Sequence, residues 1–289
     1  MFSQLILSGI AQGAIYALVA LSMTVVYRAT TIVNFGHGDM VMAGAFIAYL
    51  FVVLLGLPFL PAAFVAVVLL FILGVAIQRG LIEPIKAGPH IGFAMMSIAV
   101  GYVLRGIARA GWGREVLPMP RVFDIPPIFV GDLILTGDSL VVIGVVATFL
   151  TAFFVVFHRT RIGQVIQAVY QSERGAALIG INVRAFHCMM WGIGVAMAAI
   201  AGVLLAPITL LYPDLGANFL IRGFAAMTLG GFGSLGGAIV GGILLGVAEQ
   251  LLGFYVSTKL IDIAAYLVII SVLILRPVGL FGKAAIVRV

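Results

Sequence analysis

The stretch FLPAAFVAVVLLFILGVAI, from Phe59 to Ile77, carries no charged or strongly polar side chain and is long enough to cross a bilayer as a helix. Further apolar runs lie on both sides of it. They are Gln4 to Tyr27, Met40 to Leu57, Ile91 to Ala110, Leu140 to Phe157, Phe186 to Leu211, Phe219 to Phe254 and Leu260 to Leu275. Unbroken runs favour helices, because a membrane barrel would show short alternating segments. The predicted fold is all-α, a polytopic transmembrane helical bundle with about eight membrane segments.

The composition agrees with a membrane protein. Of 289 residues, 63% are hydrophobic and 9% are charged, and the mean hydropathy of +1.27 excludes a water-soluble domain of this length. The single cysteine, Cys188, excludes an internal disulfide and a cysteine-rich metal site. The first residues lack the basic start of a cleavable signal peptide, so we expect the chain to begin with a membrane helix.

One apolar run, Phe219 to Phe254, is too long for a single membrane helix. It is interrupted by the sequence GGFGSLGG at residues 230–237. Glycine tolerates backbone conformations that other residues avoid. The run is therefore predicted to form two helical pieces that meet at a glycine turn, either as a re-entrant hairpin or as a pair of crossings.

The basic residues predict the orientation, since cytoplasmic loops carry an excess of Lys and Arg. The residues placed inside are Arg28, Arg79, Lys86, Arg159, Arg161, Arg174, Arg184, Arg276, Lys283 and Arg288. Those placed outside are Arg105, Arg109, Arg114, Arg121 and Lys259, accompanied by Glu115, Asp124, Asp132, Asp138 and Asp214. This arrangement gives an outside N-terminus and a cytoplasmic C-terminus. It also accounts for the net charge of +6, so no nucleic-acid partner is expected.

The whole chain, 1–289, is predicted to be a single transmembrane domain with a weak parallel internal repeat. About residues 1–90 align with 198–287 at a constant shift, which pairs Phe35-Gly36 with Phe232-Gly233 and Arg79 with Arg276. In each half a polar or glycine-rich turn precedes two apolar segments and a basic end.

Polar residues inside the apolar runs are the first candidates for function, because an ionisable group in hydrocarbon costs about 2.5 to 3.5 kcal/mol on insertion scales. The candidates for a translocation pathway are Asn34, Gly36, His37 and Asp39 at the first turn, Thr228, Gly231, Gly233, Ser234 and Gly236 around the second, and Glu249. At the first turn, a broken helix can line a pathway with its freed backbone groups. The alternative is a plain cytoplasmic turn in which Asp39 caps the following helix.

Glu249 has several open roles. Its carboxylate can bind the amino group of a substrate, carry a proton, or fix a packing contact with a partner helix. Arg222 can offset its charge electrostatically, but the sequence does not show whether the two residues meet. His37 and Asp39 have no nearby cysteine or second histidine, so no metal site is expected there.

The loop from residue 158 to 186 is predicted to be a cytoplasmic coupling loop. Ser172 can cap a short helix from Glu173 to Ile179, and Gly180 can end it. The apolar patch Ala176-Ala177-Leu178-Ile179 would be poorly placed in water unless a partner covers it. An ordinary solvated loop is the alternative.

No enzymatic chemistry is expected. The chain lacks a Gly-rich phosphate loop with its Lys and Ser or Thr, and it shows no Ser-His-Asp or metal-ligand set. Neither a catalytic residue nor a cofactor or metal is predicted.

Several motifs resemble the branched-chain amino acid ABC permease family, and they follow the family order along the chain. These motifs are NFGHGDMVMAGAF near the start, IGQVIQAVYQSERGAALIGINV with AMAAIAGVL in the middle, and TLGGFGSLGGAIVGG and RPVGLFG towards the end. The sequence is most similar to the shorter of that system's two permeases, since a long N-terminal extension is absent.

The resemblance implies a membrane-spanning permease subunit of an ATP-binding-cassette importer in the bacterial inner membrane. Its implied partners are a second related permease, two cytoplasmic ATPase subunits and a periplasmic substrate-binding protein. The short helix would be the coupling helix, with Ser172, Glu173, Ala176, Ala177, Leu178 and Gly180 involved in docking. The implied substrates are branched-chain or related small amino acids, or urea and short amides. The alternative is an ion-coupled secondary transporter, in which Asp39 and Glu249 would titrate.

Overall fold

The structure is a computed structural model that describes residues 1–85, 90–120, 125–130 and 133–282. Lys86, Arg121, Asp124, Asp132, Lys283 and Arg288, which were assigned to one side of the membrane, lie outside these residues. Its first elements in chain order are α1 (Phe2–Thr30), α2 (His37–Tyr49), α3 (Phe59–Ile77) and α4 (His90–Trp112). A hairpin of β1 (Ile128–Val130) and β2 (Leu133–Leu135) precedes α5 (Gly137–Arg159), α6 (Arg161–Gln171) and α7 (Glu173–Leu178). The remaining helices are α8 (Val183–Leu205), α9 (Leu215–Gly230), α10 (Leu235–Tyr255) and α11 (Lys259–Leu275).

The fold is the predicted polytopic helical bundle. Within the described residues, 7 helical segments are long and apolar enough to cross a membrane. Helices α9 and α11, with 16 and 17 residues, are shorter than these seven segments. The predicted break in the run Phe219 to Phe254 is confirmed, because α9 ends at Gly230 and α10 begins at Leu235.

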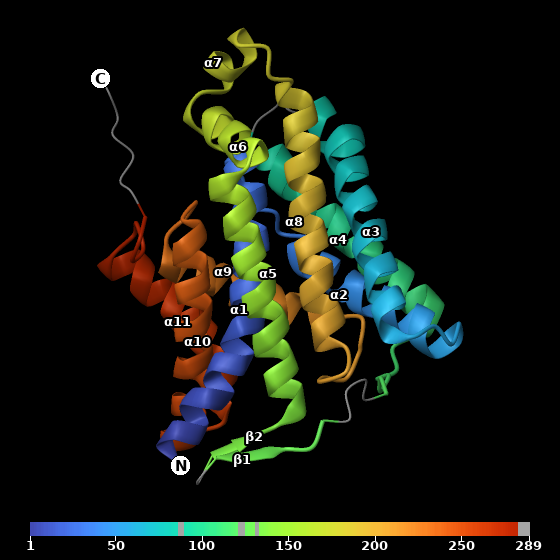
Figure 1. Cartoon of the computed structure of the whole chain (residues 1–289), viewed down its shortest axis with the longest axis vertical. Coiled ribbons are helices and arrows are strands. Elements are labelled where there is room, and N and C mark those ends of the chain that lie inside the picture. Colours follow the sequence, from blue (N-terminus) through green and yellow to red (C-terminus); the bar gives the residue numbers. More distant parts are fainter. Residues whose placement is uncertain (86–89, 121–124, 131–132, 283–289) are drawn as a thin grey trace.

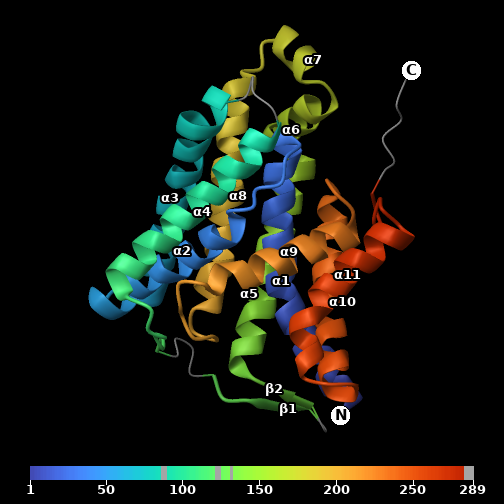
Figure 2. The same ribbon diagram turned by 180° about the vertical axis from the view of Figure 1, so that it is seen from behind.

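Helix α1 forms the centre of the bundle and packs against α8, α9 and α10 (Figures 1 and 2). Its contact with α10 is very close, because a Cβ at Gly13 would lie 2.7 Å from the Cα of Ile243. On the other side of this contact, a Cβ at Gly246 would lie 2.5 Å from the Cα of Gly13. Close approach of small residues is a usual way for membrane helices to associate.

Helix α5 stands at the edge of the bundle. Only 17% of its most apolar window is buried, the lowest share among the candidate spans of the described chain. It packs mainly on α1 and continues directly into α6. Its exposed apolar side chains therefore face lipid or another subunit.

The two ends of the bundle differ in charge. The loop elements α6 and α7 lie at the end opposite to the N-terminus and to the β1–β2 hairpin (Figure 1). Arg28 closes α1 at the α7 end, and Arg159 and Arg161 flank the junction of α5 and α6. The residues predicted to be cytoplasmic thus gather around the predicted coupling loop.

Candidate functional site

The first glycine turn leads the chain back into the bundle. After α1 ends, Thr31 adopts a left-handed conformation with φ 56°. Nε2 of His37, the first residue of α2, lies 2.7 Å from Oγ of Ser22. Because Ser22 precedes the end of α1 by about two turns, α2 begins about 12 Å inside that end. The segment is therefore a broken helix whose second part starts within the bundle.

The turn itself is held by hydrogen bonds and by tight packing. The backbone N–H of Phe35 donates to Oγ of Ser97 at 3.1 Å, and the N–H of Gly36 donates to Oδ1 of Asn34 at 3.0 Å. A Cβ at Gly36 would collide with the carbonyl oxygen of Ser97. A Cβ at Gly38 would likewise collide with backbone of α9. The first turn thus has no room for additional atoms.

Asp39 forms an ion pair with Arg105 of α4. Oδ1 of Asp39 accepts from Nε of Arg105 at 3.1 Å and from Nη2 at 2.9 Å. The capping role considered for Asp39 is wrong, because no side chain caps the start of α2. Arg105, which is predicted to lie towards the outside, is part of α4, and its side of the membrane stays a prediction. A charged residue near the end of an apolar run resembles a loop residue until its buried partner is known.

The ion pair extends towards the end of the bundle that holds the N-terminus. Nη1 of Arg105 lies 3.5 Å from Oδ1 of Asp214, and Nη2 of Arg109 donates to the same oxygen at 2.7 Å. Asp214 immediately precedes α9. These contacts join the start of α9 to α4 and α2.

The second glycine turn lies at the α7 end. Gly231 and Gly233 have φ values of 103° and 77°, which favour glycine. The carbonyl of Gly233 accepts from Nε of Arg28 at 2.8 Å. Oγ of Ser234 accepts from the N–H of Gly237 at 3.1 Å and so caps α10. The side chain of Arg28 also lies 4.3 Å from the ring centre of Tyr170, which belongs to α6.

The chain after α11 closes this turn from one side. The N–H groups of Leu280 and Phe281 donate to the carbonyls of Leu229 and Gly230 at 2.9 and 3.0 Å. Nearby, the hydroxyl of Thr228 donates within its own helix. Gly236 is different, because a Cβ there would meet no atom within 4 Å. The motif RPVGLFG therefore packs on the motif GGFG, and one face of the turn stays open.

Glu249 is fully buried and belongs to a hydrogen-bonded chain. Its Oε1 accepts from Nε of Arg222 at 3.1 Å, which confirms the expected compensation of charge. Its Oε2 accepts from the hydroxyl of Tyr16 at 2.7 Å. The amide of Gln12 donates to that hydroxyl at 2.6 Å, and the amide of Gln250 donates to Oε1 of Gln12 at 2.8 Å. Gln12, Tyr16 and Gln250 come from the two ends of the chain, so no local sequence pattern indicates that they meet.

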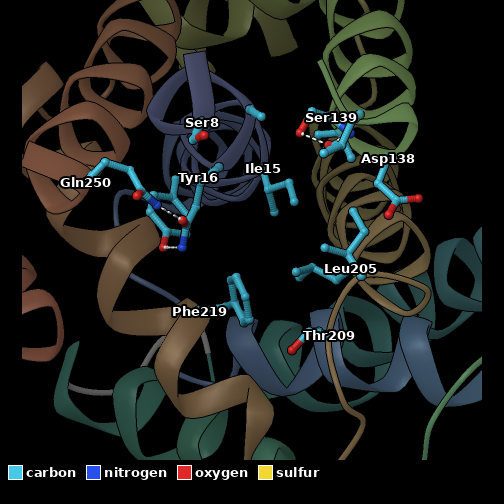
Figure 3. A pocket seen from close by; sticks show the side chains of 14 residues that line it. Ser8, Ile15, Tyr16, Asp138, Ser139, Leu205, Thr209, Phe219 and Gln250 are labelled. Carbon is cyan, nitrogen blue, oxygen red and sulfur yellow. Dashed lines mark hydrogen bonds between the residues drawn. The ribbon is translucent and has the colours of Figure 1, made fainter. Parts of the chain in front are cut away.

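A cavity of about 370 Å³ opens beside this chain, between α1, α5, α8, α9 and α10 (Figure 3). Its polar lining residues are Ser8, Gln12, Tyr16, Thr136, Asp138, Ser139, Thr209 and Gln250, and its apolar lining includes Ile15, Val142, Leu205, Ile208 and Phe219. The predicted pathway residues do not line it. They lie instead in three places, namely the first turn, the second turn, and Glu249 behind Tyr16.

The predicted coupling loop has the expected local structure. Oγ of Ser172 accepts from the N–H of Gly175 at 3.0 Å and caps α7, and Gly180 follows with φ 87°. The capping and the ending predicted for this helix are confirmed. Helix α7 projects beyond the other helices (Figure 1). Leu178 and Ile179 at its tip are 88% and 74% exposed.

The remaining residues of the loop attach it to the bundle. Ala176 is buried, whereas Ala177 is exposed. Oε1 of Glu173 lies 3.2 Å from Nε2 of His187 in α8. Among the described residues, no group of three or more His, Cys, Asp and Glu side chains is placed to hold a metal ion. The loop therefore presents an apolar tip on a capped and anchored base.

Comparisons with known proteins agree along nearly the whole chain. The family model described as branched-chain amino acid transport system / permease component matches residues 5–275. The chain is 30% identical to the high-affinity branched-chain amino acid transport system permease protein LivH of Escherichia coli K12, over 100% of this chain and 98% of that protein. It is equally 30% identical to the permease protein BraD of Pseudomonas aeruginosa, with the same coverage.

More distant matches are also found. The ribose import permease protein RbsC of Escherichia coli is 28% identical over 44% of this chain and 42% of its own length. Among solved structures, PsaBC from Streptococcus pneumoniae in complex with Fab has a TM-score of 0.49 at 16% identity, covering 95% of this chain and 91% of that chain. This structural likeness is too low to support an assignment.

Proposed function

Because the chain belongs to the family of branched-chain amino acid transport system permease components, we propose that it is the membrane-spanning subunit of an ATP-binding-cassette importer for branched-chain or related small amino acids. In this proposal it works with a second related permease, two cytoplasmic ATPase subunits and a periplasmic substrate-binding protein in a bacterial inner membrane. The chain itself has no ATPase site and couples to the hydrolysis that its partners perform. Urea and short amides remain within the proposed range of substrates.

The apolar tip of α7 is the observation that carries this proposal. Ala177, Leu178 and Ile179 are exposed at the basic end of the bundle, beyond the apolar belt of the membrane helices. A short, capped helix with an exposed apolar tip suits docking into a groove of a partner protein. In an importer of this family, the partner at that end would be an ATPase.

Movement of α7 would reach the bundle through α6. The carbonyl of Phe157 at the end of α5 is in close contact with Gly163 of α6. Tyr170, near the other end of α6, lies under Arg28, and Arg28 binds the carbonyl of Gly233. A push on α7 is therefore transmitted to α5 and to the second glycine turn by packed groups rather than by a flexible linker. This is the proposed route from ATP binding to a change in the pathway.

Under this proposal the predicted pathway residues fall into three groups with different roles. Gly236 faces open space, which supports a place on a pathway or subunit surface for the second turn, with Gly231, Gly233, Ser234 and Thr228 shaping it. Asn34, Gly36, His37 and Asp39 are tightly packed, which supports a role in holding the broken helix. For Glu249, the bond to Arg222 supports a packing role, and the link to Tyr16 brings its charge close to the cavity.

A charge placed on the tip of α7 tests the proposal. Ala177→Arg adds a long cation to an exposed position, so the permease should still insert while its ATPase subunits no longer copurify and uptake is lost. Gln171→Arg is the matched control, because it adds the same charge at an exposed position at the end of α6. Normal uptake by the complete assembly carrying Ala177→Arg would show that α7 does not couple to an ATPase.

A further inference from the structure

We propose that the cavity between α1, α5, α8, α9 and α10 is a solute-binding site within the permease, which accepts small amino acids with an aliphatic side chain and disfavours acidic ones. This inference rests on the proposed import function and adds a site that the motifs did not indicate. The cavity volume of about 370 Å³ falls in the lower part of the range for small-molecule pockets. It therefore suits a solute of amino-acid size.

The cavity has a polar wall of Gln12, Tyr16 and Gln250, and the apolar residues across from it are interspersed with Asp138, Ser139 and Thr209. Figure 3 shows Tyr16 and Gln250 on one side, and Ile15, Leu205 and Phe219 facing the same space from other directions. A branched aliphatic side chain can be buried against the apolar side at a gain of about 0.8 kcal/mol for each CH₂ group. The polar side would remain for the charged ends of the solute. A lipid acyl chain would leave that polar side without a partner.

The polar side is already ordered by its internal hydrogen bonds. Gln250 donates to Gln12, Gln12 donates to Tyr16, and Tyr16 donates to the buried Glu249. Each carboxamide has two N–H groups, and only one of them is used in this chain. The carbonyl oxygen of Gln250 has no donor among the described residues. The wall thus keeps both donors and an acceptor for a ligand, which matches the carboxylate and the ammonium of an amino acid.

The charges around the cavity favour the ammonium group of an amino acid and disfavour an additional carboxylate on its side chain. Asp138 lines the cavity, and no Lys, Arg or His is among the lining residues that the structure describes. Behind the polar wall, the charge of Glu249 is compensated by Arg222, which also lies 3.7 Å from Asp262. Within the described part of the chain, acids therefore outnumber bases near the cavity. A side-chain carboxylate on the solute would be repelled in this low-dielectric setting.

The position of the cavity fits a site that loads from outside and responds to ATP. Ser8 of α1 and Ser139 of α5 lie near the ends of these helices that are far from α7. Helix α5 forms one wall and is joined at its other end to α6. A displacement of α6 and α7 would therefore change the width of the cavity.

Cysteine protection tests the site, because Cys188 is the only cysteine of the chain. In a Cys188→Ser background, Ser139→Cys places a thiol on the cavity wall, and Ser3→Cys places one at an exposed position of α1 outside it. The complete assembly, with its binding protein and ATPases, is reconstituted in vesicles and labelled with a small thiol reagent. We expect leucine to slow labelling of Ser139→Cys at least about fivefold, glutamate to leave it unchanged, and Ser3→Cys to label at one rate throughout.

A second variant separates this inference from the proposed function. Val142→Trp fills the apolar side of the cavity, so leucine should no longer protect Ser139→Cys and leucine uptake should fall, while the ATPases still copurify. If the assembly imports leucine but leucine never protects Ser139→Cys, the inference is overturned and the import function stands. If protection follows the lipid composition of the vesicles rather than the solute, the cavity holds lipid and the inference is also overturned. Absence of any amino-acid uptake would instead contradict the proposed function.

Discussion

The two glycine turns share the dipeptide Phe-Gly, yet glycine is needed for a different reason in each. Gly36 has an ordinary φ of −85°, and it is glycine because a Cβ would strike the carbonyl of Ser97. Gly233 has a φ of 77°, and the nearest atom to a Cβ there would be the hydroxyl of Tyr170 at 3.3 Å. The first turn therefore requires glycine because no side chain fits there, whereas the second requires glycine because its backbone is left-handed.

From this difference we infer that the first turn has a structural role and that the second moves during transport. The first turn is fixed by the packing of α2 against α4 and α9 and by the ion pair of Asp39 with Arg105. The second turn is fixed mainly by backbone contacts with the segment that follows α11, and it touches α6 through Arg28. We expect substitutions in the first turn to act on stability and substitutions in the second turn to act on transport.

The largest loss of stability is expected for Gly36→Val. The valine side chain cannot fit beside α4, so the loss of stability should be about 3 kcal/mol, and little protein should accumulate in the membrane. The thermal midpoint of the detergent-extracted permease measures this effect. Gly106→Val in α4 is the control, since a Cβ there meets no atom within 4 Å. Equal stability of the two variants would contradict the claim that close packing at Gly36 holds the first turn.

The next effect is expected for Asp39→Ala, which leaves the guanidinium of Arg105 inside the bundle without its partner. Removing one member of a buried pair costs about 3 to 5 kcal/mol, and the 17% exposure of the Arg105 side chain places this pair at the lower end. In a double-mutant cycle, the loss of stability of the variant that carries both Asp39→Asn and Arg105→Gln should be smaller than the sum of the losses of the two single variants. Simple additivity in this double-mutant cycle would mean that the two side chains do not interact.

A smaller effect is expected at Gly233, and it should depend on the backbone preference of the new residue. Gly233→Val forces a β-branched residue into a left-handed conformation at a cost of about 1 to 2 kcal/mol. Gly233→Asn should cost less, because asparagine tolerates this conformation. The thermal midpoints of both variants should be compared with that of Gly36→Asn. Equal tolerance of asparagine at both positions would contradict the claim that Gly36 is required by close packing and Gly233 by a left-handed backbone.

The smallest effect on stability is expected for Gly236→Leu. The new side chain meets open space and leucine is a better helix former than glycine, so the thermal midpoint should stay unchanged or rise slightly. Uptake should nevertheless be blocked while the assembly stays intact, because a bulky group would occupy the open face of the turn. If Gly236→Leu instead prevents assembly with the partner subunits, this face is a subunit contact.

The sequence predicted the features that depend on neighbouring residues. The break between α9 and α10 follows from a glycine-rich segment inside an overlong apolar run, and the cap of α7 follows from Ser172 and Gly180. Arg222 was a possible counter-charge for Glu249, but only the structure shows that the two side chains meet, across two helices that follow each other directly.

Features that depend on distant helices were missed. The Asp39–Arg105 pair joins α2 to α4, and the polar wall of the cavity joins α1 to α10. Hydrophobic periodicity shows which residues share a face, but it does not show which faces meet. For this reason the sequence does not indicate that Arg105 pairs with Asp39, or that Gln12, within an apolar run, joins a polar chain.

Transport by the complete assembly in sealed vesicles tests the central claim most directly. The vesicles contain this permease, its related partner and the ATPases, and labelled leucine is offered with the binding protein. We predict that uptake requires ATP on the side that carries α7, requires the binding protein, and persists when proton and sodium gradients are collapsed. Uptake that is driven by an ion gradient without ATP would contradict the account and identify the chain as a secondary transporter.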